Sequence, residues 1–271
     1  MQLSKLTVLS ESIHHLVVNK NPSMFCQPPM NRQFYNNTVL HTLQEMGYDQ
    51  QKLFPINRLD FNVSGCVCIG RSKIAAQQFS KNMKGGKWSN KGFIIDRKYV
   101  GLMEPIKSNK YLSQFKKLPL VEDDVGLIDV IVDGKQARTK YQIIDSDDDS
   151  GRKLVALRLL TGRKHQIRIH LNHLGYSIVG DYKHGYRNTS DKTTRSDDLP
   201  YSAPIALHGA YMRNKIGMKE YETFAPLQWS WKLSDGSGLW DWMIERGHMS
   251  GEQETFGELS DKIKEALRDL K

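Results

Sequence analysis

Short runs of hydrophobic residues between polar turns predict a chain rich in β-strands. In the first quarter of the sequence, Val8-Leu9 and residues 15–20 are predicted to be two short strands around a polar turn, and residues 66–69 are an apolar run typical of a buried strand. Asn21-Pro22 ends the second run, because proline cannot continue a hydrogen-bonded ladder. Cys66 and Cys68 share one face of the third run and are expected in the core.

Two stretches with helical spacing separate these strands. Residues 39–46 carry apolar side chains at helical intervals, and Gly47 closes the pattern. Ser72 is a suitable N-cap for a second helix that runs to about Met83. The pattern places three residues on the inner face of this second helix, namely Ile74, Ala75 and Phe79.

The middle of the chain reads as an antiparallel meander. Residues 93–104 are predicted to form paired strands, the second of them Tyr99 to Met103. Turn residues separate further strands, which are expected at residues 128–132, 137–144, 154–160 and 206–210, with another ending at 224–227.

One more helix follows Thr161-Gly162. It is expected to begin at Arg163 or Lys164 and to run to His173, with Gly175 as its C-cap. Helical spacing then brings four residues to one side of this helix: Lys164, Ile167, Arg168 and Leu171.

The charge balance narrows the class of partner. Lys and Arg number 39 against 30 Asp and Glu, a formal net charge of +9, so the surface should attract polyanions, which include nucleic acids and acidic proteins alike. No stretch reaches the length of a membrane span. Three cysteines are too few and wrongly spaced for a zinc site.

A basic stretch at residues 84–92 is a candidate RNA contact. It holds Lys84, Lys87 and Lys91 around Trp88 and no acidic residue. Lysines suit a phosphate backbone and the indole suits a stacked base. A solvated hairpin turn explains the same residues equally well.

Two motifs carry the candidate chemistry. The first is Arg58-Leu59-Asp60 followed by Ser64-Gly65, directly before the buried run at 66–69. Alone it is typical of a surface turn. The second, about a hundred residues later, is Thr161-Gly162-Arg163-Lys164-His165-Gln166-Ile167-Arg168. Together they resemble the RluA family of RNA pseudouridine synthases, and weaker matches extend over roughly residues 8–231.

The resemblance implies roles for individual residues. Asp60 matches the catalytic carboxylate, Arg168 the arginine that pairs with it, and Tyr99 the active-site tyrosine that stacks on the base. Arg58 matches the arginine that enters the RNA as the uridine leaves the stack, and Ile167 is expected to line the pocket. The remaining expected RNA contacts are Arg163, Lys164, His165 and the lysines of the 84–91 loop.

The chain also departs from the family pattern. Asn57 stands where the family usually has histidine, and Val63 where it has threonine. Neither position carries the chemistry in the family. Residues 1–231 are expected to form the catalytic domain. Residues 232–271, which have no counterpart in the resemblance, are expected to add a terminal helix that packs on the same domain.

The combined interpretation is a mixed α/β (α+β) pseudouridine synthase fold, with a mostly antiparallel bent sheet, flanking helices and a central basic cleft. The function that the resemblance implies is isomerisation of uridine in a structured RNA by a monomeric enzyme, with mitochondrial large-subunit rRNA favoured. Because this reaction needs no redox step, we expect neither a metal nor a cofactor. The alternatives are a tRNA-directed synthase, a catalytically silent RNA-binding or ribosome-assembly factor, an Asp-dependent hydrolase, and a cytoplasmic location.

Overall fold

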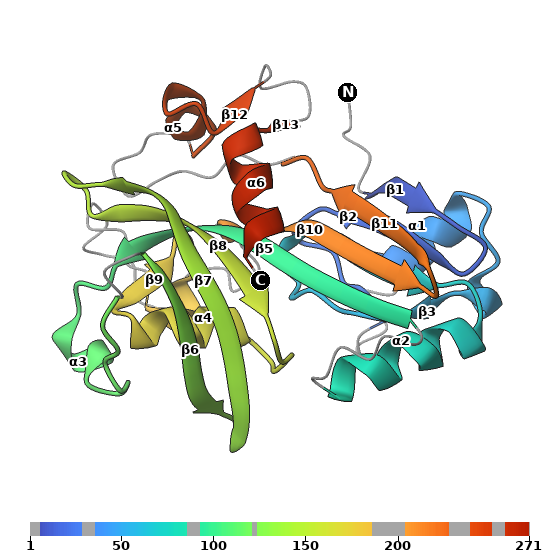
Figure 1. Cartoon of the computed structure of the whole chain (residues 1–271), viewed down its shortest axis with the longest axis horizontal. Coiled ribbons are helices and arrows are strands. Elements are labelled where there is room, and N and C mark those ends of the chain that lie inside the picture. The colour runs from blue at the N-terminus through green and yellow to red at the C-terminus, as the bar shows by residue number, and fades with distance from the viewer. Residues whose placement is uncertain are drawn as a thin grey trace. The chain divides into compact units, whose positions relative to one another are not determined.

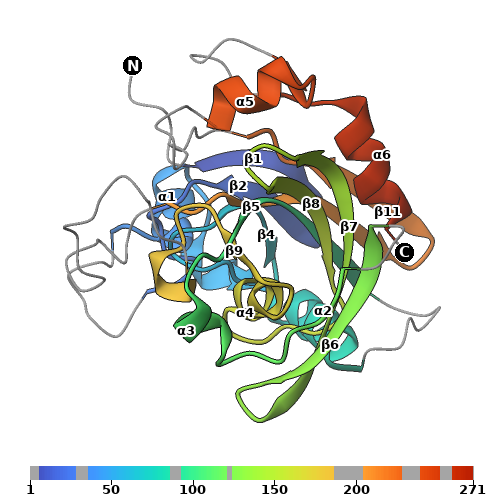
Figure 2. The same cartoon turned by 90° about the vertical axis from the view of Figure 1, so that its left-hand side faces the viewer.

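The chain forms two compact units, and strands β5 and β10 each run from one into the other. The first unit contains residues 1–97 and 209–226, and the second contains residues 98–208 and 227–271. The computed structural model describes residues 6–28, 36–85, 93–120, 124–185, 204–227, 239–250 and 258–270. Figures 1 and 2 show the elements from two directions.

The first unit is built on a mostly antiparallel sheet. Its strands follow the order β1-β2-β4-β10. Leu16 of β2 faces Ile69 of β4, and Val18 faces Val67, so the two apolar runs cover each other along their length. The strands are β1 (Leu6–Glu11), β2 (His15–Lys20), β4 (Ser64–Gly70) and β10 (Leu207–Ile216), with β11 (Lys219–Phe224) paired to β10 and β3 (Phe54–Pro55) paired to β4.

Helices α1 (Val39–Glu45) and α2 (Lys73–Gly85) accompany this sheet, with the short helix η2 (Gln50–Lys52). Thr38 accepts a hydrogen bond from the backbone of His41 and starts α1. Ser72 caps α2 as predicted. Phe79 packs in a core with Val17, Cys66 and Cys68, whereas Ile74 is 71% exposed, so its predicted inward position is wrong. Ala75 is buried as predicted, and Ala76 is buried in place of Ile74.

Gly65 allows β4 and β10 to approach closely. A side chain at this position would begin 2.4 Å from the backbone of Gly209, and the φ of Gly65 is +113°. Both constraints favour glycine. The glycine of the first motif is therefore required by the packing of β4, the strand to which it belongs.

The second unit carries the meander. Strand β5 (Phe93–Pro105) is one continuous strand where two paired strands were predicted. On one edge it pairs with β8 (Arg152–Leu159). Strand β8 pairs in turn with β7 (Lys135–Asp147), and β7 pairs with β6 (Val125–Val132). On its other edge β5 pairs with β9 (Tyr176–Ile178). Asp133-Gly134 forms the tight turn from β6 to β7, with positive φ at both residues.

Helix α4 spans Gln166–His173, so it begins after Lys164. The prediction that Lys164 lies on the same helical face as Arg168 is therefore wrong. The cause is His165, whose φ of 53° and ψ of 22° put the left-handed conformation directly before the helix. Two short helices lie near α4 in the same unit: α3 (Asn109–Leu112) and η3 (Tyr182–His184) (Figure 2).

The C-terminal residues return to the meander of this second unit. They form α5 (Leu239–Glu245), a small hairpin of β12 (Met249–Ser250) and β13 (Glu258–Leu259), and α6 (Asp261–Asp269). Helix α6 contacts β7 and β8 (Figure 1). The buried Lys98 of β5 donates to the carbonyl oxygens of Leu267 and Arg268 at 2.5 and 3.1 Å, which binds a cation to the C-terminal end of α6.

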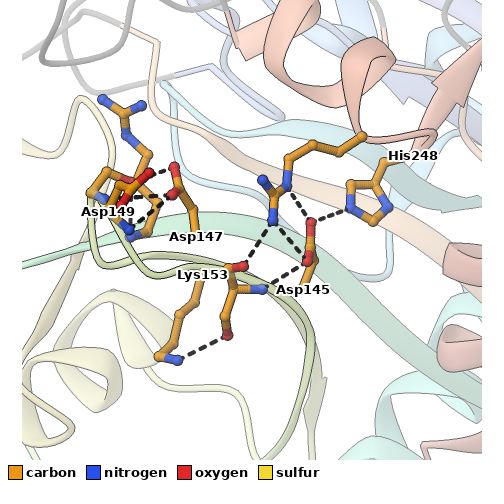
Figure 3. Close-up of polar contacts among 9 residues, drawn as sticks. Asp145, Asp147, Asp149, Lys153 and His248 are labelled. Atoms are coloured by element: carbon orange, nitrogen blue, oxygen red, sulfur yellow. Dashed lines mark hydrogen bonds and ion pairs between the residues drawn. The ribbon is translucent and has the colours of Figure 1, made fainter.

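A charged cluster holds the preceding part of the tail. The His248 ring points at the Asp145 carboxylate of β7 (Figure 3), with Nε2 at 2.8 Å from Oδ2. Arg246 donates to the same carboxylate and stacks over the ring of Trp242. The Arg246 guanidinium, with His248, holds the pKa of Asp145 below its usual range. The tail is thus tied to the meander at two separate places.

The mixed α/β class with a large, mostly antiparallel sheet is confirmed. The bend of the sheet, the central basic cleft and the division at residue 231 stay predictions. None of the helices in the described ranges combines the length and apolar character of a membrane-spanning segment.

Candidate active site

In the first unit, the turn that carries Asp60 is fixed through its backbone. The Leu59 N–H donates to Sγ of Cys26 at 3.2 Å, and the Cys26 thiol lies 3.5 Å from the Leu59 carbonyl oxygen. The Val63 N–H donates to the Asp60 carbonyl oxygen at 3.1 Å. Leu59 is buried, Asp60 is partly exposed and Arg58 is exposed. The turn therefore presents its two charged side chains from a rigid base.

Lys20 is the second support of this turn. Its buried ammonium donates to the carbonyl oxygens of Asn21, Met24 and Phe61 at 2.9, 3.0 and 3.3 Å. Burial lowers the pKa of Lys20 to about 8, opposed by Cys26 and by the nearby Asp60 carboxylate. One cation thus connects the loop after β2 to the residue that follows Asp60.

The two departures from the family motif have structural roles. Asn57 is buried, accepts from the Cys68 N–H at 2.7 Å and donates to the Cys66 carbonyl oxygen at 3.4 Å, so its amide pairs with an edge of β4. Val63 is buried as well. Both residues therefore shape the motif from within the fold.

In the second unit, Arg168 forms a bidentate ion pair. Its Nε and Nη2 each lie 2.7 Å from one carboxylate oxygen of Asp181. The side chains are only 4% and 1% exposed. A planar guanidinium held by two parallel bonds has a fixed direction. Asp181, the residue before η3, is thus a site residue that the motif comparison did not single out.

Ile167 and Tyr99 are both buried in this second unit. Ile167 follows the first residue of α4. Tyr99 lies in β5 opposite Leu157 of β8. These surroundings suit a pocket wall and equally suit the core.

His165 has a histidine partner. Its Nδ1 lies 3.1 Å from Nε2 of His184, and the rings meet edge to face. Burial lowers the pKa of His184 to about 4 despite the opposing Asp181 carboxylate. The sequence motif itself offers no partner for the His165 ring, and the fold supplies one from η3. His170 is fully buried, which places it in the core of the unit.

Gln166 organises the turn before α4. Its side-chain oxygen accepts from Thr161 Oγ1 at 2.8 Å and from the Arg163 N–H at 3.0 Å, while its amide donates to Thr139 Oγ1 at 2.9 Å. Arg163 is exposed, and its guanidinium donates to the Gln136 carbonyl oxygen of β7. Lys164 is also exposed. The second motif therefore leaves its basic side chains outside and its Gln-Ile-Arg inside.

Three expected contacts lie outside the described residues. They are Lys87, Lys91 and the side chain of Lys84.

Lys20, Gln166 and Asp181 are the supporting residues to which the sequence analysis gave no role. Each lay within a stretch matching the family, which was the available signal.

A carboxylate on a fixed turn, a buried arginine and exposed basic side chains are suited to an enzyme that works on a polyanion. A family model described as RNA pseudouridylate synthase matches residues 14–173, more than half of the chain. The chain therefore belongs to the RNA pseudouridylate synthase family, and is an enzyme that isomerises uridine in RNA.

Relatives of known name extend the match. The 21S rRNA pseudouridine(2819) synthase of Kluyveromyces lactis is 30% identical over 98% of this chain and 83% of its own. Its Saccharomyces cerevisiae counterpart is 28% identical over 84% of this chain and 87% of its own. The solved structure of human RNA Pseudouridylate Synthase Domain Containing 1 shares the fold, with a TM-score of 0.58 at 18% identity over 99% of this chain and 97% of that one.

Proposed function

We propose that the chain converts a uridine of large-subunit rRNA to pseudouridine in the mitochondrion, and that it acts as a monomer. The similarity to two yeast enzymes named for 21S rRNA carries the choice of rRNA over tRNA. The alignment with the first covers nearly the whole chain, including the tail that lies beyond the family model.

In this proposal Asp60 supplies the carboxylate that drives cleavage of the bond from N1 to C1′. The freed uracil turns, a bond forms from C5 to C1′, the C5 proton leaves and N1 gains a proton. No net oxidation or reduction occurs. The support for Asp60 is its match to the catalytic position of the family and the rigid turn that carries it.

Arg168 is proposed as the cation that keeps Asp60 ionised during this reaction. A carboxylate in a pocket is driven towards its neutral form unless a positive charge compensates. The fixed orientation of Arg168 on Asp181 suits this task. Lys20 is a second cation near the Asp60 carboxylate, whose charge opposes the lowering of the Lys20 pKa.

The remaining motif residues are assigned to the substrate. Tyr99 would stack on the uracil ring, and Ile167 would form a wall of the pocket. Arg58, which is exposed, would enter the RNA as the uridine leaves its stack, because a guanidinium can stack and bind phosphate. Arg163, Lys164, His165, Lys84, Lys87 and Lys91 would contact the RNA backbone.

The test uses transcripts of large-subunit rRNA and of tRNA that carry tritium at C5 of uridine. Wild type is expected to release tritium from the rRNA transcript, whereas Asp60→Asn releases none. Asp49→Asn, an exposed aspartate paired with Lys52, is the matched control and should behave as wild type. Release from tRNA alone would overturn the proposed target. Full activity in EDTA is expected, because no step above uses a metal.

A further inference from the structure

Residues 106–118 form a basic segment, called here the lysine segment. It holds four exposed lysines, and the sequence has no acidic residue between Glu104 and Glu122. The lysines are Lys107, Lys110, Lys116 and Lys117. The function proposed above assigns this segment no role.

Both ends of the lysine segment are fastened to the C-terminal end of α4. The Ile106 N–H donates to the Gly175 carbonyl oxygen at 2.9 Å, and the Leu118 N–H donates to that of His173 at 2.7 Å. The His173 ring adds a contact of 2.8 Å from Nδ1 to the Lys116 carbonyl oxygen. The segment is therefore a fixed part of the unit.

Its middle is fastened through Tyr111. The Tyr111 hydroxyl donates to Asn172 Oδ1 at 3.0 Å, and its ring lies against Gly185, where a Cβ would fall 2.5 Å away. Burial, with the Asp181 carboxylate, raises the pKa of Tyr111 to about 12, so the phenol stays a donor. Asn172 donates onwards to the His184 carbonyl oxygen at 2.9 Å. The middle of the segment is therefore anchored to the same turn whose Asp181 binds Arg168.

The side chains that the lysine segment exposes indicate the kind of partner that it can bind. The apolar residues Tyr111, Phe115 and Leu118 are partly buried, and Phe115 packs edge-on against His173. The exposed positions carry lysine or short polar side chains such as Asn109, Ser113 and Gln114. Protein interfaces need apolar anchors at their centre, which this face lacks. Spaced ammonium groups on a rigid base suit the phosphates of a polynucleotide.

We propose that the lysine segment is an RNA-binding surface that holds the phosphate backbone of the substrate. The exposed Lys183 of η3 extends this surface. The inference rests on the proposed function, in that the bound polyanion is the RNA whose uridine is modified. Binding here would add affinity without touching the reacting base, so its loss should weaken binding and leave the chemical step unchanged.

The test is the full-length variant Lys110→Gln with Lys117→Gln. Its binding to the large-subunit rRNA transcript is measured at several salt concentrations, together with tritium release. We expect a salt slope lower by roughly 1.5–2 and at least about tenfold weaker binding at low salt. The kcat at saturating RNA should stay within about twofold of wild type. The anchoring groups of Tyr111, Phe115 and Leu118 are untouched, so the fold should be retained.

Two further variants make the result decisive. Lys219→Gln with Lys262→Gln removes two exposed lysines elsewhere and should keep the wild-type slope. Lys110→Arg with Lys117→Arg should restore binding. A wild-type slope in the glutamine variant of the segment overturns this inference, even where tritium release supports the synthase. If wild type releases no tritium from any RNA, the proposed function fails, while the slope on the same transcript still decides the segment.

Discussion

Arg168 and Asp181 meet through two hydrogen bonds of 2.7 Å, and both side chains are almost completely buried. They lie thirteen positions apart in the sequence, Arg168 near the start of α4 and Asp181 directly before η3. The direction of the proposed catalytic arginine therefore depends on the turn that follows β9.

Asp181→Asn tests this dependence. The amide keeps the shape of the carboxylate but removes its charge, which leaves a buried guanidinium without that anionic partner. Breaking a buried pair in this way costs about 3–5 kcal/mol in stability when the charge is left uncompensated. We expect tritium release to fall by on the order of 10²-fold, because misplacing a catalytic group by about 1 Å has that effect.

The control for this variant is again Asp49→Asn, which breaks an exposed pair with Lys52. It should change stability by less than about 1 kcal/mol. Urea unfolding and tritium release are measured on both proteins. Wild-type activity in Asp181→Asn would show that Arg168 needs no such anchor.

Lys20→Met removes the ammonium that joins the Asp60 turn to the loop after β2. Three carbonyl oxygens lose this donor. That of Phe61 keeps the Ser23 N–H at 2.8 Å, whereas each buried group left unpaired costs roughly 1–3 kcal/mol. Part of this cost is returned because a buried charge is removed as well. We therefore expect a moderate loss of stability and a larger loss of kcat, since the turn is no longer held.

The pH dependence of the free energy of unfolding provides a separate test of Lys20. Its pKa falls from 10.5 to about 8 on folding, so between these values the unfolded chain binds the extra proton. Wild type should therefore gain stability relative to Lys20→Met as the pH rises from about 8 to 10.5, by up to on the order of 3 kcal/mol. A constant difference across this range in urea unfolding would contradict the lowered pKa.

Local patterns were sufficient for the parts of the fold that local forces determine. The strands at residues 15–20 and 66–69, the helix after Thr38 and the cap at Ser72 follow from spacing and end residues. The Asp133-Gly134 turn was visible for the same reason. The continuity of β5 was not, because it depends on pairing with β8 and β9, which lie 50 residues or more away in the sequence.

In the candidate site, too, some features could be predicted from the sequence and others depend on the fold. Asp60, Arg168 and Tyr99 could be named from the motifs, but their surroundings required the fold. The partnership of Arg168 with Asp181 depends on where η3 lies, and the late start of α4 depends on the left-handed backbone of His165. Ile74 was misplaced because its spacing on α2 fits two faces, and packing selected Ala76 instead.

His170→Leu is expected to reduce the sensitivity of the fold to acid. Burial, with His173 nearby and opposed by Asp129, lowers the pKa of His170 from 6.5 to about 4. Between these values the unfolded chain binds the extra proton, so wild type loses stability as the pH falls from 6.5 towards 4. His170→Leu should lose less stability than wild type over this range, with a difference of up to about 1.4 kcal/mol per pH unit.

At neutral pH the same substitution should be close to neutral or stabilising. Among the described residues, neither ring nitrogen of His170 has a hydrogen-bond partner, so leucine removes an unmet polar group. Urea unfolding at pH 5 and pH 7 distinguishes the two effects. Identical losses on acidification in both proteins would place the acid-sensitive group elsewhere.

Lys98→Met should loosen the C-terminal helix. The variant removes the donor to the carbonyl oxygens of Leu267 and Arg268, at a cost of about 1–3 kcal/mol. Lys262→Met, on the exposed face of the same helix, is the matched control and should have little effect. Limited proteolysis of the tail reports the loosening, and equal cleavage of both variants would refute the anchor.

Lys98 and Tyr99 are neighbours on β5, and successive side chains of a strand point to opposite faces. A chain ending before Asp261 would still contain every motif residue, yet the strand that carries the proposed stacking tyrosine would lose the helix end that binds its neighbouring lysine. Truncations that remove α6 should therefore be treated as changes to the support of the strand that carries Tyr99.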